Sequence, residues 1–331
     1  MEIRKNVILA PYTTFRIGGP ARYFCEIESV DDLKSALNFA KENNLRFFIL
    51  GGGSNLLISD KGFDGLVIKM SIKGLEFNGE FLTVGAGENW DEVVAVAVER
   101  NLRGIENLSL IPGTAGAAVY QNIGAYGVEL KDVLESAEVL DKDSGEIKIF
   151  LSKDCQFGYR DSIFKTNKDK NLVILKIKLR LFKNKEANTI YHDLAKMFQG
   201  KKPSALELRS AVIEIRTKKL PYPDEVSNAG SFFKNPVISE VQFGHLISTS
   251  PDLKGFNLGD GLVKLSAAQL IEKCGWKGKT FGNVGVSEKH SLVLVNYGKG
   301  TAEEIMKLAE DITRSVKDEF GVELESEVEM V

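Results

Sequence analysis

The sequence predicts an α+β protein of two domains, and three observations carry this prediction. The chain has 331 residues, about twice the length of an average domain. Hydrophobic residues make up 43% and charged residues 27% of it, close to the composition of globular proteins. Helix capping signals flank a middle region in which apolar and polar residues alternate as in strands. The composition turns polar near residues 182–187, so we expect one domain at 1–185, divided near residue 70, and a second at 186–331.

Helix and strand signals follow one another in the first hundred residues. Ser29 can cap a helix that runs to about Asn43. An apolar strand at 46–50 leads into three glycines, and a second apolar strand covers 65–70. Asn89, with Glu92 three residues later, can cap another helix. This order indicates a unit rich in alternating strands and helices.

The middle and the end of the chain carry clearer patterns. Residues 136–150 predict a hairpin around an Asp-Ser-Gly turn, and 175–181 alternate as a half-buried strand. Capping boxes begin helices at Ser204, ending toward Thr217, and at Thr301, ending at Gly321; a short helix is expected at 266–273. The segment 322–330 is expected to form a strand with four glutamates on one face.

Charge and residue counts exclude several functions. The net charge of -3 gives no basic excess for nucleic acid or an anionic membrane. Three scattered cysteines and three histidines argue against a metal centre and a disulfide framework, as in a reducing compartment. We expect no membrane span and no signal peptide, and therefore a cytoplasmic protein. With 31 glycines, the composition favours a protein that holds a phosphorylated ligand and takes its chemistry from it.

Two glycine-rich segments are candidates for that ligand. Gly51, Gly52 and Gly53 follow a buried strand, and Ser54 and Asn55 add polar side chains. Successive backbone N–H groups in such a turn can form an anion-binding concavity; the alternative is an ordinary tight turn. Residues 111–127 hold four glycines and no charged residue. Such small side chains let a large ligand approach the backbone. The alternative there is close helix–strand packing.

Three further motifs are weaker when taken alone. Arg160, in FGYRDS, is either functional or part of a surface ion pair. Ser231, in NAGSFFKNP, is either presented from a turn or part of an ordinary loop that its phenylalanines anchor. The C-terminal glutamates are by default a solvated strand face.

Taken together and in this order, the motifs resemble the UDP-N-acetylenolpyruvoylglucosamine reductase family, whose FAD-binding part is of the vanillyl-alcohol-oxidase type. The resemblance runs from TTFRIGG at residue 13 to LESEV at residue 324 and includes IPGTAGAA and QNIGAYG. It implies a two-part FAD-binding domain and a smaller α+β substrate-binding domain. The last strand of the second domain would pack back on the FAD-binding domain. The segment around Tyr191 resembles the longer, tyrosine-bearing type of this family.

The resemblance also implies a reaction and its residues. NADPH would reduce the enolpyruvyl ether of UDP-N-acetylglucosamine to UDP-N-acetylmuramate, through non-covalent FAD, for the bacterial cell wall. Arg160 would stabilise the enolate-like intermediate, Ser231 would donate the proton, and Glu327 would stabilise or orient the intermediate. FAD would be held by Gly51, Gly52, Gly53, Ser54, Asn55, Ile111, Pro112, Gly113, Thr114, Gly116, Gly124 and Arg216. The UDP-sugar or the NADPH phosphates would be held by Tyr126, Tyr191, Lys219, Asn235, Lys277 and His290.

Two positions depart from the family pattern, which often reads LEPEVR where this chain has LESEVE. Ser326 stands in place of proline and Glu329 in place of arginine. Both flank Glu327, and Glu325 is the rival carboxylate. Two alternatives stay open: an oxidase on the same FAD fold, and an inactive nucleotide-sugar-binding protein. We expect a monomer, because the helix stripes indicate an internal core.

Overall fold

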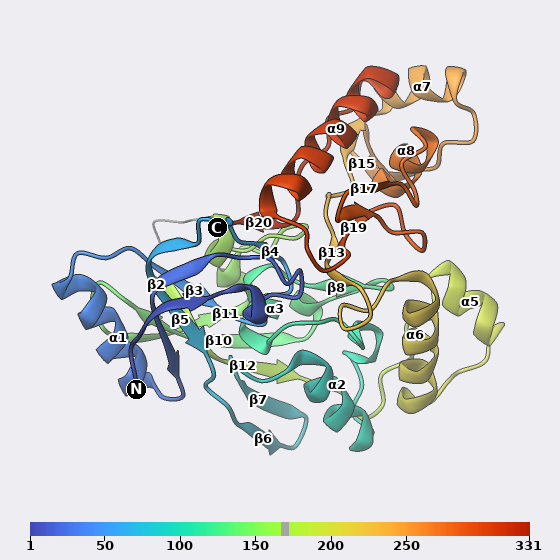
Figure 1. Ribbon diagram of the computed structural model, residues 1–331. Helices are drawn as coiled ribbons and strands as arrows, with labels where there is room; N and C mark the ends of the chain where they lie inside the picture. Colours follow the sequence, from blue (N-terminus) through green and yellow to red (C-terminus); the bar gives the residue numbers. More distant parts are fainter. Residues whose placement is uncertain (167–171) are drawn as a thin grey trace. The chain divides into compact units, whose positions relative to one another are not determined.

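The computed structural model describes residues 1–166 and 172–331, which divide into two compact units (Figure 1). Unit 1 comprises Met1–Val7, Ala21–Gly53 and Asp64–Thr217, and unit 2 comprises Ile8–Pro20, Ser54–Phe63 and Lys218–Val331. Each unit therefore combines three stretches of chain. Two short N-terminal stretches belong to unit 2, although the sequence analysis placed the second domain wholly after residue 185.

A four-stranded sheet and one helix form the first part of unit 1. The sheet has the order β1-β2-β5-β3, with β1 (Arg4–Ile8), β2 (Pro20–Ile27), β5 (Phe63–Met70) and β3 (Phe47–Leu50). The last two strands are parallel. Helix α1 (Val30–Glu42) begins where the Ser29 side chain accepts a hydrogen bond from the Asp32 N–H, which confirms the predicted cap.

The second part of unit 1 is a five-stranded antiparallel sheet with the order β11-β10-β12-β7-β6. Its β10 and β11 confirm the predicted hairpin, and on β12 the buried Leu175, Ile177 and Leu179 alternate with polar residues as expected. The strands are β6 (Leu75–Asn78), β7 (Phe81–Gly85), β10 (Leu134–Asp141), β11 (Ile147–Leu151) and β12 (Leu172–Arg180). Helix α2 (Trp90–Glu99) is capped by Asn89 as predicted.

Unit 1 also contains four helices or strand pairs that the sequence did not resolve. They are α3 (Ala115–Tyr120), the β8 (Gly124–Ala125) and β9 (Val128–Glu129) pair, α4 (Ile163–Thr166) and α5 (His192–Phe198). The last helix of the unit, α6 (Ala205–Lys219), shows the predicted capping box, because Ser204 and Glu207 exchange hydrogen bonds. Helices α5 and α6 lie beyond residue 185 yet pack in unit 1, around a small core that contains Leu194, Leu208 and Val212.

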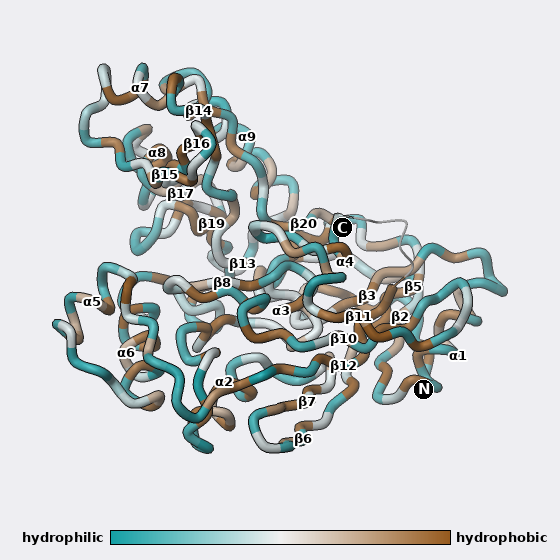
Figure 2. Tube along the Cα trace, turned by 180° about the vertical axis from the view of Figure 1, so that it is seen from behind, coloured by the Kyte–Doolittle hydropathy of each residue, from teal (hydrophilic) through white to brown (hydrophobic). Residues whose placement is uncertain are grey.

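Unit 2 contains a four-stranded sheet, a three-stranded sheet and three α-helices, besides a short two-stranded pair. One sheet has the order β13-β19-β18-β17 (Ser227–Ser231, Val293–Asn296, Val284–Val286, Thr280–Phe281), and the other has the order β14-β16-β15 (Val237–Ser239, Leu262–Leu265, Gly255–Gly259). The helices are α7 (Glu240–Thr249), α8 (Ala267–Lys273) and α9 (Ala302–Phe320). Apolar and polar residues alternate along α9 in Figure 2. Its predicted capping box at Thr301, buried stripe and left-handed Gly321 cap are all confirmed.

The predicted strand at 322–330 is wrong in its extent. Only β20 (Glu329–Met330) is a strand, and it pairs in parallel with β4 (Leu56–Leu57). Before it, Ser326 forms an isolated bridge to Phe233. The segment changes hydrogen-bonding partner along its length, because the Glu327 N–H bonds to Phe232 while the Glu329 N–H bonds to Asn55. A period of two in the sequence predicts extended backbone but not a single partner strand.

Candidate active site

The two glycine-rich segments of unit 1 lie directly against each other. A Cβ added at Gly52 would lie 2.6 Å from the Gly113 Cα, and one added at Gly51 would lie 2.9 Å from the Thr114 Oγ1. Gly53 adopts a φ of +65° and Gly113 a φ of +128°, in which other residues are strained. Glycine is therefore required here for close backbone approach, and the sequence predicted both segments.

Backbone hydrogen bonds hold the second glycine segment, 111–116, against residues 86–90, which lead into α2. The Gly113 carbonyl accepts a bond from the Trp90 N–H at 3.1 Å, and the Ala115 and Gly116 N–H groups donate to Glu88 and Ala86 at 2.9 Å. A Cβ at Gly116 would lie 2.8 Å from the Ala86 Cβ. The small residues thus allow close packing, as the alternative interpretation expects, and the ligand-binding interpretation stays a prediction.

Polar groups that fit a dinucleotide with its phosphates lie at the two glycine segments 51–53 and 111–116, here called the glycine cradle, and on α6. The buried Thr114 Oγ1 lies beside Gly51, and within the described ranges it has no protein hydrogen-bond partner. The same holds for the buried Arg216 Nε. Lys69 donates a hydrogen bond to the Gly51 carbonyl, and burial lowers the pKa of its ammonium group. Because buried polar atoms are normally paired, these residues fit a bound group that supplies acceptors, as FAD does.

Sequence reasoning missed Lys69, although a single lysine in the apolar run FDGLVIKM was a visible signal.

Arg160 lies at the tip of a tight turn in unit 1. Gly158 and Asp161 pair through both backbone N–H groups at 3.0 and 3.4 Å, and Arg160 adopts a φ of +55°. Its Nη2 donates to the Gly124 carbonyl at 2.9 Å. Asp161 instead accepts bonds from its neighbour Ser162 and from the Thr166 hydroxyl. The structure therefore joins two predicted motifs, because Arg160 contacts Gly124.

Two tyrosines and Arg216 form a third group in unit 1. The Tyr126 ring meets the Tyr191 ring edge-on, with 5.0 Å between centroids. Burial raises the pKa of Tyr126 to about 12, against the opposing effect of a hydrogen bond with Arg216. Burial lowers the pKa of the Arg216 guanidinium. Tyr191 is 46% exposed and precedes α5. One predicted cofactor residue and two predicted substrate residues thus meet.

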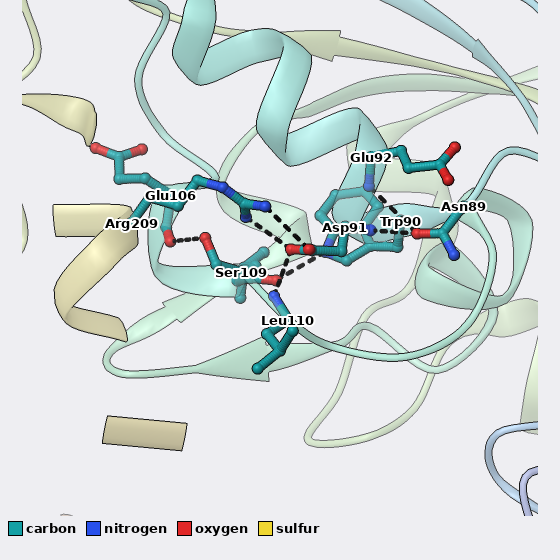
Figure 3. A network of polar contacts seen from close by, with 9 residues as sticks. Asn89, Trp90, Asp91, Glu92, Glu106, Ser109, Leu110 and Arg209 are labelled. Carbon is teal, nitrogen blue, oxygen red and sulfur yellow. Dashed lines mark hydrogen bonds and ion pairs between the residues drawn. The ribbon is translucent and has the colours of Figure 1, made fainter. Parts of the chain in front are cut away.

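Sequence reasoning also missed an ion pair near the cradle. Asp91, in the first turn of α2, forms a bidentate pair with Arg209 of α6 at 2.7 and 2.9 Å (Figure 3). Burial alone would raise the pKa of Asp91, but hydrogen bonds from Arg209 and from the Leu110 N–H lower it. Asp91 in the sequence indicated only a favourable charge at a helix start. Its partner is 118 residues away, so no local signal could have identified it.

Ser231 and Glu327 lie on paired segments of unit 2. Ser231 ends β13, where the pairing with β19 shifts register and Gly230 adopts a φ of +72°. The next residue, Phe232, accepts a 2.8 Å hydrogen bond from the Glu327 N–H. Phe232 and Phe233 are 1% and 2% exposed, which confirms the expected anchoring. The serine sits at a strand end rather than on a turn.

The rival carboxylate, Glu325, has a different setting. Its Oε1 lies 2.6 Å from the Lys234 Nζ, and its side chain is 73% exposed. Glu327 is half-buried, and its carbonyl accepts a 3.0 Å bond from the Asn55 side chain. Ser326 donates its hydroxyl to the Val328 carbonyl at 2.8 Å. The serine that departs from the family pattern therefore ties the backbone on the far side of Glu327.

Three of the predicted phosphate-binding residues gather in unit 2. Burial, followed by the charges of Lys277 and Lys219, lowers the pKa of His290. The His290 Nδ1 accepts a 3.2 Å bond from the Leu292 N–H, and Lys277 pairs with Glu272 at 3.2 Å. The side chain of Asn235 is engaged elsewhere, where its Oδ1 accepts the Ala267 N–H at the start of α8. The structure thus brings together two lysines and a histidine that are far apart in sequence.

Among residues 1–166 and 172–331, no group of three His, Cys, Asp or Glu side chains could hold a metal ion. Within the same ranges, no helix has the length and apolar character needed to cross a membrane.

The fold and the glycine cradle define an FAD-binding oxidoreductase, and comparison with known proteins agrees. Residues 21–150 match the family model "FAD binding domain", and residues 221–331 match "UDP-N-acetylenolpyruvoylglucosamine reductase, C-terminal domain". The reductases of Amoebophilus asiaticus and Pseudomonas aeruginosa are 44% and 42% identical to the chain, covering 100% and 99% of it and 100% and 98% of themselves. The chain belongs to the UDP-N-acetylenolpyruvoylglucosamine reductase family.

A solved structure supports the fold over the same length. The crystal structure of UDP-N-acetylenolpyruvylglucosamine reductase from Thermus caldophilus superposes with a TM-score of 0.71 at 26% identity. The alignment covers 100% of this chain and 99% of that one. The predicted α+β class and the predicted family are both confirmed.

Proposed function

We propose that the chain catalyses the NADPH-dependent reduction of UDP-N-acetylenolpyruvoylglucosamine to UDP-N-acetylmuramate in peptidoglycan synthesis. The observation that carries this proposal is the backbone contact between Gly52 and Gly113 in a chain of this family. Bound FAD would supply the transfer of a hydride from NADPH to the vinyl methylene carbon of the substrate. The remaining chemistry falls to side chains of the protein.

The FAD-binding role is assigned to both glycine segments and to Arg216. Backbone N–H groups of a glycine turn suit a diphosphate, and the Thr114 hydroxyl and the Arg216 Nε are buried donors that such a ligand would satisfy. Neither segment contains His or Cys, in keeping with a non-covalent complex. The full proposed set is Gly51, Gly52, Gly53, Ser54, Asn55, Ile111, Pro112, Gly113, Thr114, Gly116, Gly124 and Arg216.

Arg160 is proposed to stabilise the charge that develops on the substrate. Addition of hydride to the vinyl carbon leaves an enolate-like intermediate next to the carboxylate. A guanidinium can bind such a group through two parallel hydrogen bonds. Because its Nη2 is held by the Gly124 carbonyl, the guanidinium is oriented before substrate arrives, and preorganised charge is what lowers the barrier.

Ser231 is proposed to donate the proton to the carbon that carries the carboxylate. An ordinary serine hydroxyl is a weak acid, so the basic enolate must drive the transfer. Glu327 is proposed to stabilise or orient the intermediate. The Phe232–Glu327 hydrogen bond ties the two segments at this point, and the exposed pair with Lys234 makes Glu325 the weaker candidate.

Binding of the UDP-sugar and the NADPH phosphates is assigned to six residues. Lys219 and Lys277 place two positive charges near His290, and lysines bind phosphate as point charges. Tyr191 is exposed beside Tyr126, so it can contact a sugar or a base. Tyr126, Tyr191, Lys219, Asn235, Lys277 and His290 make up this proposed set.

Domain roles, location and assembly are also proposals. FAD binding is assigned to residues 1–185 with Arg216 of α6, and substrate binding to residues 186–331. We place the protein in the cytoplasm, where NADPH and UDP-sugars are made, and expect a monomer.

The test begins with the purified protein. It should be yellow, release intact FAD on denaturation, and, without oxygen, turn over NADPH catalytically only when the enolpyruvyl substrate is present. A colourless protein that gains no flavin when FAD is added would refute the proposal.

A further inference from the structure

An ion pair outside the proposed contact residues connects two elements that carry them. Asp91 and Arg209 pair through two hydrogen bonds, and the Asp91 Oδ1 also accepts the Leu110 N–H at 2.5 Å (Figure 3). Leu110 directly precedes the segment Ile111–Gly116, and Arg209 belongs to α6, which carries Arg216. We propose that Asp91 and Arg209 are positioning residues that hold this segment and Arg216 in the geometry that binds FAD.

The backbone at Leu110 shows why a tie is needed. Leu110 has a φ of +58°, a left-handed conformation that is unfavourable for a branched apolar residue. Such a conformation persists only where its surroundings impose it. The Asp91 carboxylate holds the N–H of this residue, and Gly113 follows three positions later. A loosened Leu110 would therefore shift the glycine segment.

The helix side of the pair acts on Arg216. Arg209 and Arg216 are seven residues apart, about two turns, so they lie on the same face of α6. Asp91 bonds Arg209 directly, and Arg216 is close enough for its charge to help lower the pKa of Asp91. The Asp91 carboxylate thus holds α6 at a fixed position against the glycine segment. Its negative charge also stabilises the buried Arg216 guanidinium.

A neighbouring set of contacts limits the movement of the same loop. Arg103 donates to the Pro203 carbonyl at 2.9 Å, just before α6. The buried Glu106 accepts the Gly104 N–H at 2.5 Å, and Ser109 donates its hydroxyl to the Glu106 carbonyl at 2.6 Å. These contacts hold residues 103–109 without help from Asp91. The Asp91–Arg209 pair therefore acts on the conformation of Leu110, the residue that follows them.

The inference rests on the proposed FAD site and is tested on the flavin-loaded protein. The variants are Asp91→Asn and Arg209→Gln, with release of FAD followed by the rise in flavin fluorescence in native buffer. Each should release FAD about tenfold faster than the wild type, the loss expected for one hydrogen bond to a charged group. Arg209→Lys, which keeps a charge but not the bidentate geometry, should fall between them and the wild type.

A matched control separates positioning from general stability. The Asp141 carboxylate also pairs with a lysine, Lys148, at 2.6 Å and accepts the Asp143 and Ser144 N–H groups, but on the β10–β11 hairpin. Asp141→Asn should leave FAD release within twofold of the wild type, although it also loses an ion pair. The unfolding midpoint of each apoprotein is measured in parallel.

The outcomes are distinct. Faster release from Asp91→Asn and Arg209→Gln, but not from Asp141→Asn, supports the inference. Wild-type release rates in both variants, or equal acceleration in the control, overturn it. If Asp91→Asn does not fold, Arg209→Gln, which keeps the Leu110 hydrogen bond, decides the question by the same criterion. A wild-type protein that binds no FAD refutes the proposed function itself.

Discussion

Substitution of Gly52 by alanine tests the glycine cradle at its tightest point. The new Cβ would lie 2.6 Å from the Gly113 Cα and 3.1 Å from its carbonyl carbon, whereas ordinary contact begins at 3.4 Å. The two backbones must therefore separate by about 0.8 Å, the difference between 2.6 and 3.4 Å. Overpacking of this kind costs roughly 1–3 kcal/mol of unfolding free energy.

The same displacement should weaken FAD binding. A hydrogen bond that lengthens by about 0.8 Å from 2.9 Å no longer meets hydrogen-bond geometry. One bond to a charged group contributes about 1.5–3 kcal/mol, so FAD affinity should fall by about 10- to 150-fold. FAD titration of the apoprotein measures the affinity, and urea denaturation measures the stability.

The control for this substitution is Gly244→Ala in α7, where the added Cβ meets nothing within 4 Å. It should raise stability slightly, since alanine favours a helix more than glycine does, and leave FAD affinity unchanged. If Gly52→Ala binds FAD as the wild type does, the two segments do not form the cofactor cradle. If its stability is also unchanged, the packing argument is wrong as well.

Four further predictions concern residues of the proposed site. Ser231→Ala should keep flavin reduction by NADPH but lose substrate turnover by about 10²–10⁴-fold, measured by stopped-flow absorbance; normal turnover would remove its role as proton donor. Glu327→Gln should lower kcat by about 10²-fold or more, whereas Glu325→Gln should stay within about twofold, and the reverse order would reassign the carboxylate. Arg160→Lys should lower kcat by about 10²-fold at unchanged FAD content, because lysine cannot form the bidentate contact; equal kcat would contradict the assignment. For His290, burial lowers the pKa below its ordinary value near 6.5, so the unfolded chain takes up its proton first as the pH falls. Stability should therefore decline below about pH 6.5, more steeply in the wild type than in His290→Asn by urea denaturation; parallel curves would refute this.

Local signals in the sequence predicted most helices and strands because their causes are local. A cap such as Ser29 or Thr301 binds a backbone N–H three residues away, and the stripe of α9 follows from 3.6 residues per turn. The alternation on β12 likewise follows from the period of a strand. Such features need no knowledge of the rest of the chain.

Features that depend on distant partners were beyond the sequence. The segment after α9 has the period of a strand, but its partners lie near residues 55 and 232, so its pairing is split. The stretches Ile8–Pro20 and Ser54–Phe63 join unit 2 through contacts such as that of Asp60, whose carboxylate accepts two N–H groups at the start of α9. No spacing rule encodes those contacts.

The candidate site shows the same division. Gly52 could be proposed from the sequence because close backbone approach demands glycine, whereas Arg160 was proposed only through the family resemblance. The Asp91–Arg209 pair was missed because a charged residue on a helix surface predicts no particular partner, and the two residues are 118 positions apart. Positioning residues of this kind become visible only in the fold.

An anaerobic half-reaction experiment tests the central claim most directly. The flavin-loaded protein is bleached with one equivalent of NADPH, and UDP-N-acetylenolpyruvoylglucosamine is then added without oxygen. We predict that the yellow absorbance returns fully and that one UDP-N-acetylmuramate forms per flavin. Absorbance that returns only when oxygen is admitted, with no UDP-N-acetylmuramate formed, would contradict the account.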